Sequence, residues 1–222
     1  MMNPGTGRWA AASGVAFAVL FAAGILTLGE LGGSFGDSDE TFISYYADSG
    51  NRARDIVGAY LLAGAGLSFL WFLNHLRGRL RAAGDESARL SGVAFASSVV
   101  FVAMLFAAGA ALVTVNASLA LGDLFDQEGR QLEGPEVSIL PQLGYVLLFL
   151  YGGFAAAFTV ATTSLAALRS GLFPTWLAWL GFAAAALLLF AIAIVPIFAL
   201  SIWALAASFV LFRDDRTAER PT

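Results

Sequence analysis

The side chains best suited to chemistry in this chain are five polar residues beside long apolar blocks. If they turn inward together, their carboxylate, amide and phenol groups form an outward-facing pocket suited to a proton or a cation. For Asp55 itself, the favoured interpretation is a position in the first turn of its helix, where the helix dipole favours a carboxylate and water reaches it. The candidate pocket residues are Glu30, Asp55, Asn116, Gln142 and Tyr145.

Other reactive groups are scarce. The chain has no Cys, no Lys and a single histidine, His75. Its other basic residues are 12 arginines. Thiolate, Schiff-base and multi-histidine metal chemistry are therefore excluded. The motifs H-E-x-x-H and G-x-S-x-G and a glycine-rich phosphate loop are absent too, and no basic surface is available for nucleic acid. We predict a protein that is not an enzyme, with no catalytic residues, no cofactor, no metal and no nucleic-acid partner.

The composition is that of a membrane protein. Of the 222 residues, 59% are hydrophobic and 13% are charged, and the mean hydropathy is +0.77. Soluble domains are about 45–50% apolar and about 25% charged. The apolar residues gather in blocks of the roughly 20 residues that a helix needs to cross a bilayer, too long and continuous for barrel strands. The predicted fold is all-α, a polytopic membrane helix bundle in contact with the lipid bilayer.

We expect six transmembrane helices in a single domain over residues 1–222. A cleaved signal peptide is the alternative for the first block, but such segments usually have about 7–15 apolar residues, so we expect a retained helix. Residues 173–212 carry no charge and would be about 60 Å long as one helix, so they must turn back, near 192–196 at Pro196. The predicted helices are 9–28, 55–76, 90–121, 137–168, 174–192 and 196–212.

A short amphipathic helix is predicted at about residues 39–47, in the first polar loop. Phe42, Ile43, Tyr45 and Tyr46 would lie along one side of it. An apolar side of this kind suits a helix that rests in the headgroup region of the membrane.

The arginines predict the orientation. With the N-terminus inside, nine arginines fall on the cytoplasmic side and three outside, in agreement with the positive-inside rule. Both termini are then cytoplasmic, in a multi-pass protein of the cell (plasma) membrane. The inner set is Arg8, Arg77, Arg79, Arg81, Arg89, Arg169, Arg213, Arg216 and Arg220, and the outer set is Arg52, Arg54 and Arg130.

Two helix faces predict contacts. On the fourth helix, residues spaced by three and four predict a packed seam, with the wall of a polar cavity as the alternative. On the third helix, a ridge of small residues predicts close contact with another helix, in this chain, in a second copy or in a membrane-protein partner. The seam is Gln142, Tyr145, Phe149, Gly152, Ala156, Thr159 and Thr163, and the ridge is Ala103, Ala107, Ala111, Thr114 and Ser118.

Residues 45–81 resemble a known group of proteins. Tyr46-Ala47-Asp48, the arginines at 52 and 54, Gly58-Ala59-Tyr60-Leu61 and the run from Trp71 to Arg77 carry the resemblance. The group consists of small, uncharacterised actinobacterial polytopic membrane proteins that are rich in alanine, poor in lysine and predicted to have about six helices. It has no assigned activity, so the resemblance implies neither a function nor a site.

Two classes of function remain open. The first is a non-enzymatic accessory or assembly component that acts through helix contacts. The second is a small transporter or channel for protons, cations or small metabolites that uses the candidate pocket. Pumps and carriers usually place ionisable groups near the middle of the membrane, and no such residue is evident here, which favours the first class.

Overall fold

The computed structural model describes residues 5–28, 38–124 and 136–218, and in these ranges every regular element is helical. The predicted all-α class is therefore confirmed. The elements are α1 (Gly5–Thr27), α2 (Asp39–Ala47), α3 (Ser49–Ala82), α4 (Asp85–Leu124), α5 (Glu136–Tyr145), the π-helical η1 (Val146–Gly152), α6 (Gly153–Ser170), α7 (Thr175–Leu188), the 3₁₀ turns η2 (Ala191–Ala193) and η3 (Val195–Ile197), and α8 (Phe198–Ala218).

Four helical segments are long and apolar enough to cross a membrane. They are Ser49–Ala82, Asp85–Leu119, Val137–Ser170 and Val195–Arg213. Two further apolar helices, Ala11–Thr27 and Thr175–Leu188, are shorter within the described residues. The helices are compatible with an integral membrane protein.

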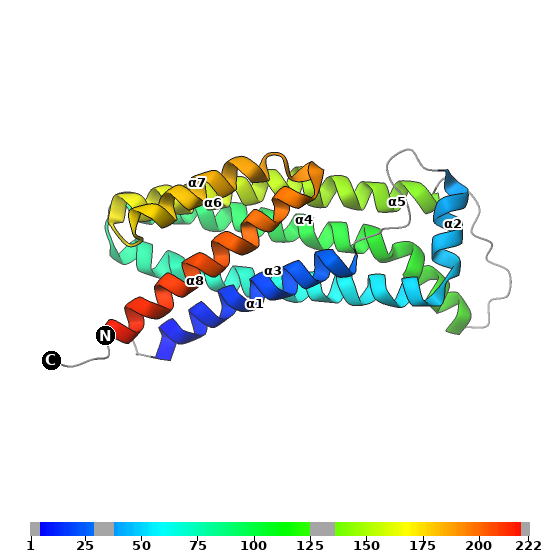
Figure 1. The fold of residues 1–222 in the computed structure, drawn as a ribbon, viewed down its shortest axis with the longest axis horizontal. Coiled ribbons are helices and arrows are strands. Elements are labelled where there is room, and N and C mark those ends of the chain that lie inside the picture. The colour runs from blue at the N-terminus through cyan, green and yellow to red at the C-terminus, as the bar shows by residue number, and fades with distance from the viewer. Residues whose placement is uncertain (1–4, 29–37, 125–135, 219–222) are drawn as a thin grey trace.

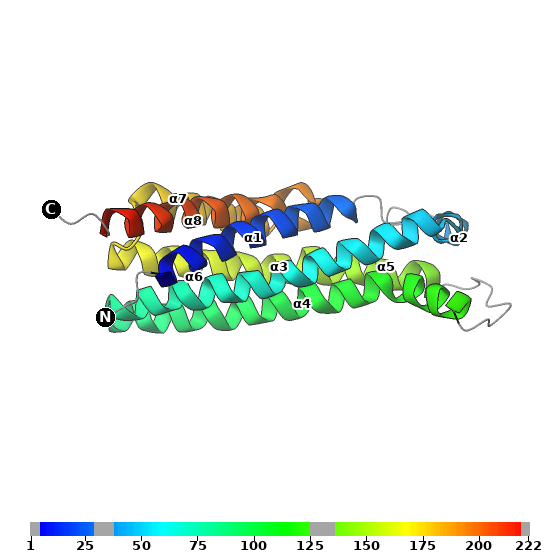
Figure 2. The ribbon, with the colours of Figure 1, turned by 90° about the horizontal axis from the view of Figure 1, so that it is seen from below.

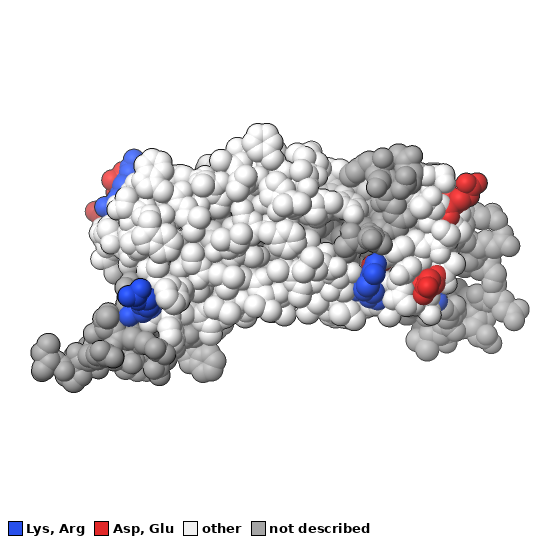
Figure 3. Space-filling view, in the orientation of Figure 1, with Lys and Arg blue, Asp and Glu red and all other residues white. Residues whose placement is uncertain are grey.

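The long helices run along one axis of the molecule (Figures 1 and 2). α1 packs between α3 and α8, α4 lies against α3 and α6, and α7 lies against α6 and α8. α2 crosses one end of the bundle, which we call the α2 end; the start of α1 and the end of α8 lie at the other, the terminal end. On the face drawn in Figure 3 the charged side chains lie at these two ends, and the middle is uncharged.

The centre of the bundle is filled by phenylalanines from three helices. Phe17 and Phe21 of α1, Phe69 of α3 and Phe101 of α4 are completely buried. The ring centroids of Phe17 and Phe69 are 4.5 Å apart, and those of Phe69 and Phe101 are 5.4 Å apart. α1 is thus part of the core of the bundle.

The predicted seam on the fourth helix is packed inside the bundle. Phe149, Gly152 and Ala156 are buried, and the hydroxyl of Thr159 donates a hydrogen bond to Ser97 Oγ of α4 at 2.9 Å. The helix is not uniform, however. Pro141, which lacks an N–H, lies inside α5, and the π-helical η1 follows it.

Most of the predicted ridge on the third helix makes no contact with another helix of this chain. Ala103, Ala107 and Thr114 are exposed, and α4 instead buries larger residues such as Leu105 and Leu112 against its neighbours. Leu105 and Leu112 are seven positions apart and therefore lie on the same side of the helix, away from the exposed residues of the ridge. They fill the space towards the core, so most of the small residues remain on the outside.

The chain turns back between α7 and α8, as predicted, but over a longer stretch. α7 ends at Leu188 and α8 begins at Phe198. The turn lies close to α6: a Cβ added at Gly153 would be 2.9 Å from the Cβ of Ala191 in the turn and 2.9 Å from the carbonyl oxygen of Leu188 at the end of α7. Within the turn Ile194 has φ 66°, the only positive value at a non-glycine residue in the described ranges.

Candidate functional site

α2 forms a cover over its end of the bundle. Phe42 and Tyr46 are buried there, packed with Val115 of α4 and Val137 of α5. The bounds of α2, Asp39–Ala47, coincide with the predicted segment 39–47. Its apolar side, however, faces the protein and not the lipid headgroups, because the ends of α4 and α5 offer apolar side chains at the matching place.

Hydrogen bonds hold α2 in position. Asn51 donates its Nδ2 to the carbonyl oxygen of Tyr45, and Arg52 donates its Nη1 to that of Tyr46, both at 3.2 Å. On the other side, the hydroxyl of Ser138 in α5 donates to Asp39 Oδ1 at 2.6 Å. α2 is therefore linked both to the start of α3 and to α5.

Asp55 lies beneath this cover and is completely buried. The Tyr45 hydroxyl of α2 donates to its Oδ1 at 3.0 Å, and Asn116 Nδ2 of α4 donates to its Oδ2 at 3.1 Å. The favoured interpretation of Asp55, a place in the first turn of its helix, is wrong. α3 begins at Ser49, and the acid that caps it is Asp48, which accepts a hydrogen bond from Gly50 N.

Asp55 forms no salt bridge with a described residue, although the positive charge of Arg54 acts on it. The neighbouring Arg54 instead donates its Nη2 to the Tyr45 hydroxyl at 3.2 Å. Each oxygen of Asp55 accepts one hydrogen bond from a neutral donor. Desolvation by burial raises the pKa of Tyr45 to about 12. The hydrogen bond from Arg54 opposes this effect, and the negative charge of Asp55 adds to it.

Two more buried oxygen atoms lie in the same region without a hydrogen-bond partner. They are Asn116 Oδ1 and the hydroxyl of Tyr46. Burial raises the pKa of Tyr46, and the charge of Asp55 adds to this effect, which places the phenol within electrostatic range of the carboxylate. We refer to Tyr45, Tyr46, Asp55 and Asn116 as the Asp55 cluster.

The structure brings some of the predicted pocket residues together. Asp55 and Asn116 are in direct contact, and the phenol of Tyr145, which lies at the junction of α5 and η1, is within electrostatic range of Asp55. Gln142 is half-buried on α5 and forms no hydrogen bond among the described residues. Glu30 lies outside the described residues.

Sequence reasoning missed Tyr45 and Tyr46 as members of the site. Their apolar side was assigned to the membrane surface. A signal was available, because only Asp48 separates α2 from α3 and Tyr45 lies ten positions before Asp55. So short a connection folds α2 back against α3 and places the tyrosines beside its first turns.

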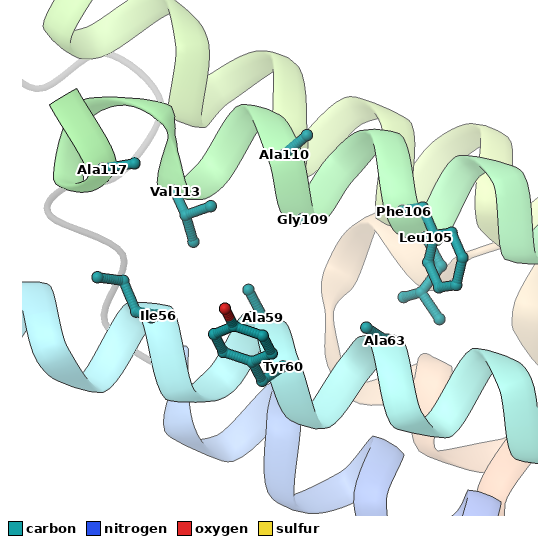
Figure 4. Close-up of a pocket in the computed structure, with 10 residues that line it drawn as sticks. All are labelled: Ile56, Ala59, Tyr60, Ala63, Leu105, Phe106, Gly109, Ala110, Val113 and Ala117. Carbon is teal, nitrogen blue, oxygen red and sulfur yellow. The ribbon is translucent and has the colours of Figure 1, made fainter. Parts of the chain in front are cut away.

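A groove with apolar walls runs between α3 and α4, on the outside of the bundle (Figure 4). Its volume is about 510 Å³. The ring of Tyr60 lies beside it with 76% of its surface exposed. The lining residues are Ile56, Ala59, Tyr60, Ala63, Leu105, Phe106, Gly109, Ala110, Val113 and Ala117.

No family model, curated protein or solved structure matches the chain. Within the described ranges, no group of three or more His, Cys, Asp or Glu side chains is placed to hold a metal ion. The geometry of the Asp55 cluster and the arrangement of the helices therefore carry the functional argument.

Proposed function

We propose that the chain is a multi-pass protein of the plasma membrane with six transmembrane helices, cytoplasmic termini and the α2 end outside. It acts as a non-enzymatic accessory or assembly component through contacts between helices. The arginines support the orientation, because six of those with described side chains lie near the terminal end and two near the α2 end. The six are Arg77, Arg79, Arg81, Arg89, Arg169 and Arg213, and the two are Arg52 and Arg54.

The observation that carries this proposal is the aromatic centre of the bundle. The interlocked rings of Phe17, Phe69 and Phe101 occupy the space that a carrier would need for a polar path. Of the charged side chains in the described residues, only Asp55 is fully buried, and it lies near the α2 end. Ion carriers usually place such groups along the path and near the middle of the membrane, so this interior favours a role in contacts.

The test is photocrosslinking in native membranes from a photoreactive residue at position 60, beside the α3–α4 groove. The matched control has the same residue at position 190, because Phe190 is also strongly exposed, at 68%, but lies in the turn after α7. We expect a discrete protein adduct from position 60 alone. Equal adducts at both positions, or adducts with lipid only, would contradict the proposal.

A small transporter or channel for protons, cations or small metabolites is the second candidate, and the buried carboxylate of Asp55 favours it. The test is flux into liposomes that contain the purified protein. The Asp55→Asn variant is compared with Glu40→Gln, which removes an exposed charge from α2 at the same end. Flux that only Asp55→Asn abolishes supports transport, and a Glu30→Gln variant then tests the remaining acid of the predicted pocket. Folded protein without flux above empty liposomes excludes this candidate.

A further inference from the structure

We propose that the Asp55 cluster binds a monovalent metal cation, with oxygen ligands from the Asp55 carboxylate, the Asn116 side-chain carbonyl and the Tyr46 hydroxyl. Binding requires no passage through the bundle. The inference therefore goes beyond the accessory role and does not depend on it.

The first argument is charge. A buried carboxylate that contacts no opposite charge is unfavourable, and the positive charge of Arg54 acts on Asp55 only from beyond the Tyr45 hydroxyl. Both donors to Asp55 are neutral, and the guanidinium of Arg54 is hydrogen-bonded to the Tyr45 hydroxyl. A cation beside the carboxylate would neutralise the charge directly.

The second argument is the supply of oxygen atoms. Asn116 Oδ1 and the Tyr46 hydroxyl belong to completely buried side chains, and neither atom has a hydrogen-bond partner. The amide nitrogen of Asn116 donates a hydrogen bond to Asp55. The ring centroid of Tyr46 lies 5.2 Å from that of Tyr45, whose hydroxyl also donates a hydrogen bond to Asp55. Carboxylate, amide and hydroxyl oxygens are the ligands that hard cations prefer.

The third argument concerns the charge of the ion. Asp55 supplies one negative charge, and no second carboxylate joins it within the described residues. A divalent ion would leave an excess positive charge in a buried site close to Arg54. A monovalent ion balances the carboxylate, and Na⁺ is the probe that we choose.

The test measures the melting temperature of the purified, full-length protein in neutral detergent. NaCl replaces N-methyl-D-glucamine chloride at constant ionic strength, with KCl and LiCl as comparators. We expect the melting temperature to rise with Na⁺ concentration, by roughly 5–10 °C at a hundredfold excess over the dissociation constant. Asp55→Asn should abolish this rise and Tyr46→Phe should reduce it, whereas Glu40→Gln should retain it.

Direct binding of radioactive Na⁺ to the wild-type protein keeps the test decisive if Asp55→Asn does not fold. Equal melting temperatures in all four chlorides together with no bound Na⁺ would overturn the proposal, as would a full response in Asp55→Asn. Stability that depends on pH but on none of the cations would assign the neutralising role to a proton, which also overturns it. Each of these results leaves the crosslinking test of the accessory role unaffected.

Discussion

Two regions of the bundle bury polar atoms, and they do so in opposite ways. In the Asp55 cluster, hydrogen bonds connect α2, α3 and α4 through one carboxylate. Between α8 and its neighbours, the hydroxyls of Ser164 and Ser208 and the indole N–H of Trp203 are equally buried, but they form no hydrogen bond within the described structure. We call these three residues the α8 set.

The α8 set lies where backbones approach closely. A Cβ added at Gly14 of α1 would collide with Ser208 Oγ, and one added at Gly181 of α7 would meet both Ser164 Oγ and Trp203 Nε1. Small residues allow helices in a membrane to come together in this way. The comparison shows that burial alone does not identify a functional polar residue. A buried charge with unused oxygen atoms around it is the more informative combination.

The largest effect is expected in the α8 set. Gly181→Leu should lower the free energy of unfolding by about 3 kcal/mol, because α6 and α8 leave no space for a side chain. Unfolding by sodium dodecyl sulfate in mixed micelles measures it. The control is Gly78→Ala in α3, where a Cβ would have no neighbouring heavy atom within 4 Å outside its own stretch of helix. This alanine should raise the free energy of unfolding by about 0.5–1 kcal/mol. A Gly181→Leu protein as stable as the wild type would show that the contact is not close.

In the Asp55 cluster, Asn116→Leu should lower the stability by about 2 kcal/mol, because it removes a donor from a buried carboxylate. The same unfolding assay, repeated in an Asp55→Leu background, isolates the interaction. The cost of Asn116→Leu should be smaller there. An equal cost in both backgrounds would mean that Asn116 contributes by packing and not through Asp55.

Tyr45→Phe should lower the stability by about 1.5 kcal/mol near pH 8, through loss of the hydrogen bond to Asp55. Because burial raises the pKa of Tyr45 from 10.0 to about 12, the contribution of the neutral phenol is complete below pH 10 and is lost as the pH rises through 12. The difference between wild type and Tyr45→Phe should shrink over that interval. Absorbance of the phenolate, compared between the two proteins, locates the titration. A difference titration centred at pH 10 would contradict the contact.

The smallest effect is expected for Ser208→Ala. Its hydroxyl has no partner among the described residues, so its removal should change the stability by less than about 0.5 kcal/mol. The same unfolding assay applies. A loss as large as that of Asn116→Leu would remove the distinction between the two regions, because it would show that the hydroxyl is bonded.

The sequence predicted that Asp55 and Asn116 lie together, but it did not indicate which side of α4 faces the core. Asp55 and Asn116 were assigned to one candidate pocket because the alternating direction of the helices places both near the same side of the membrane, and the structure shows them in contact. For the α4 ridge containing Ala103 and Ala107, the sequence predicted a helix contact without indicating which helix, and the structure leaves these two residues exposed. Apolar residues surround this helix, so the pattern alone does not distinguish an inner from an outer face.

The sequence by itself determined the helical class, the approximate positions of the long helices and the turn near Pro196. These features depend on the local chain, because each apolar segment must satisfy its own backbone hydrogen bonds and a proline interrupts them. Only the tertiary structure decided which side of α4 lies inside, where α2 docks and that Asp55 is enclosed. These outcomes depend on the fit of side chains between helices far apart in the sequence, and lipid, unlike water, does not favour one apolar face over another.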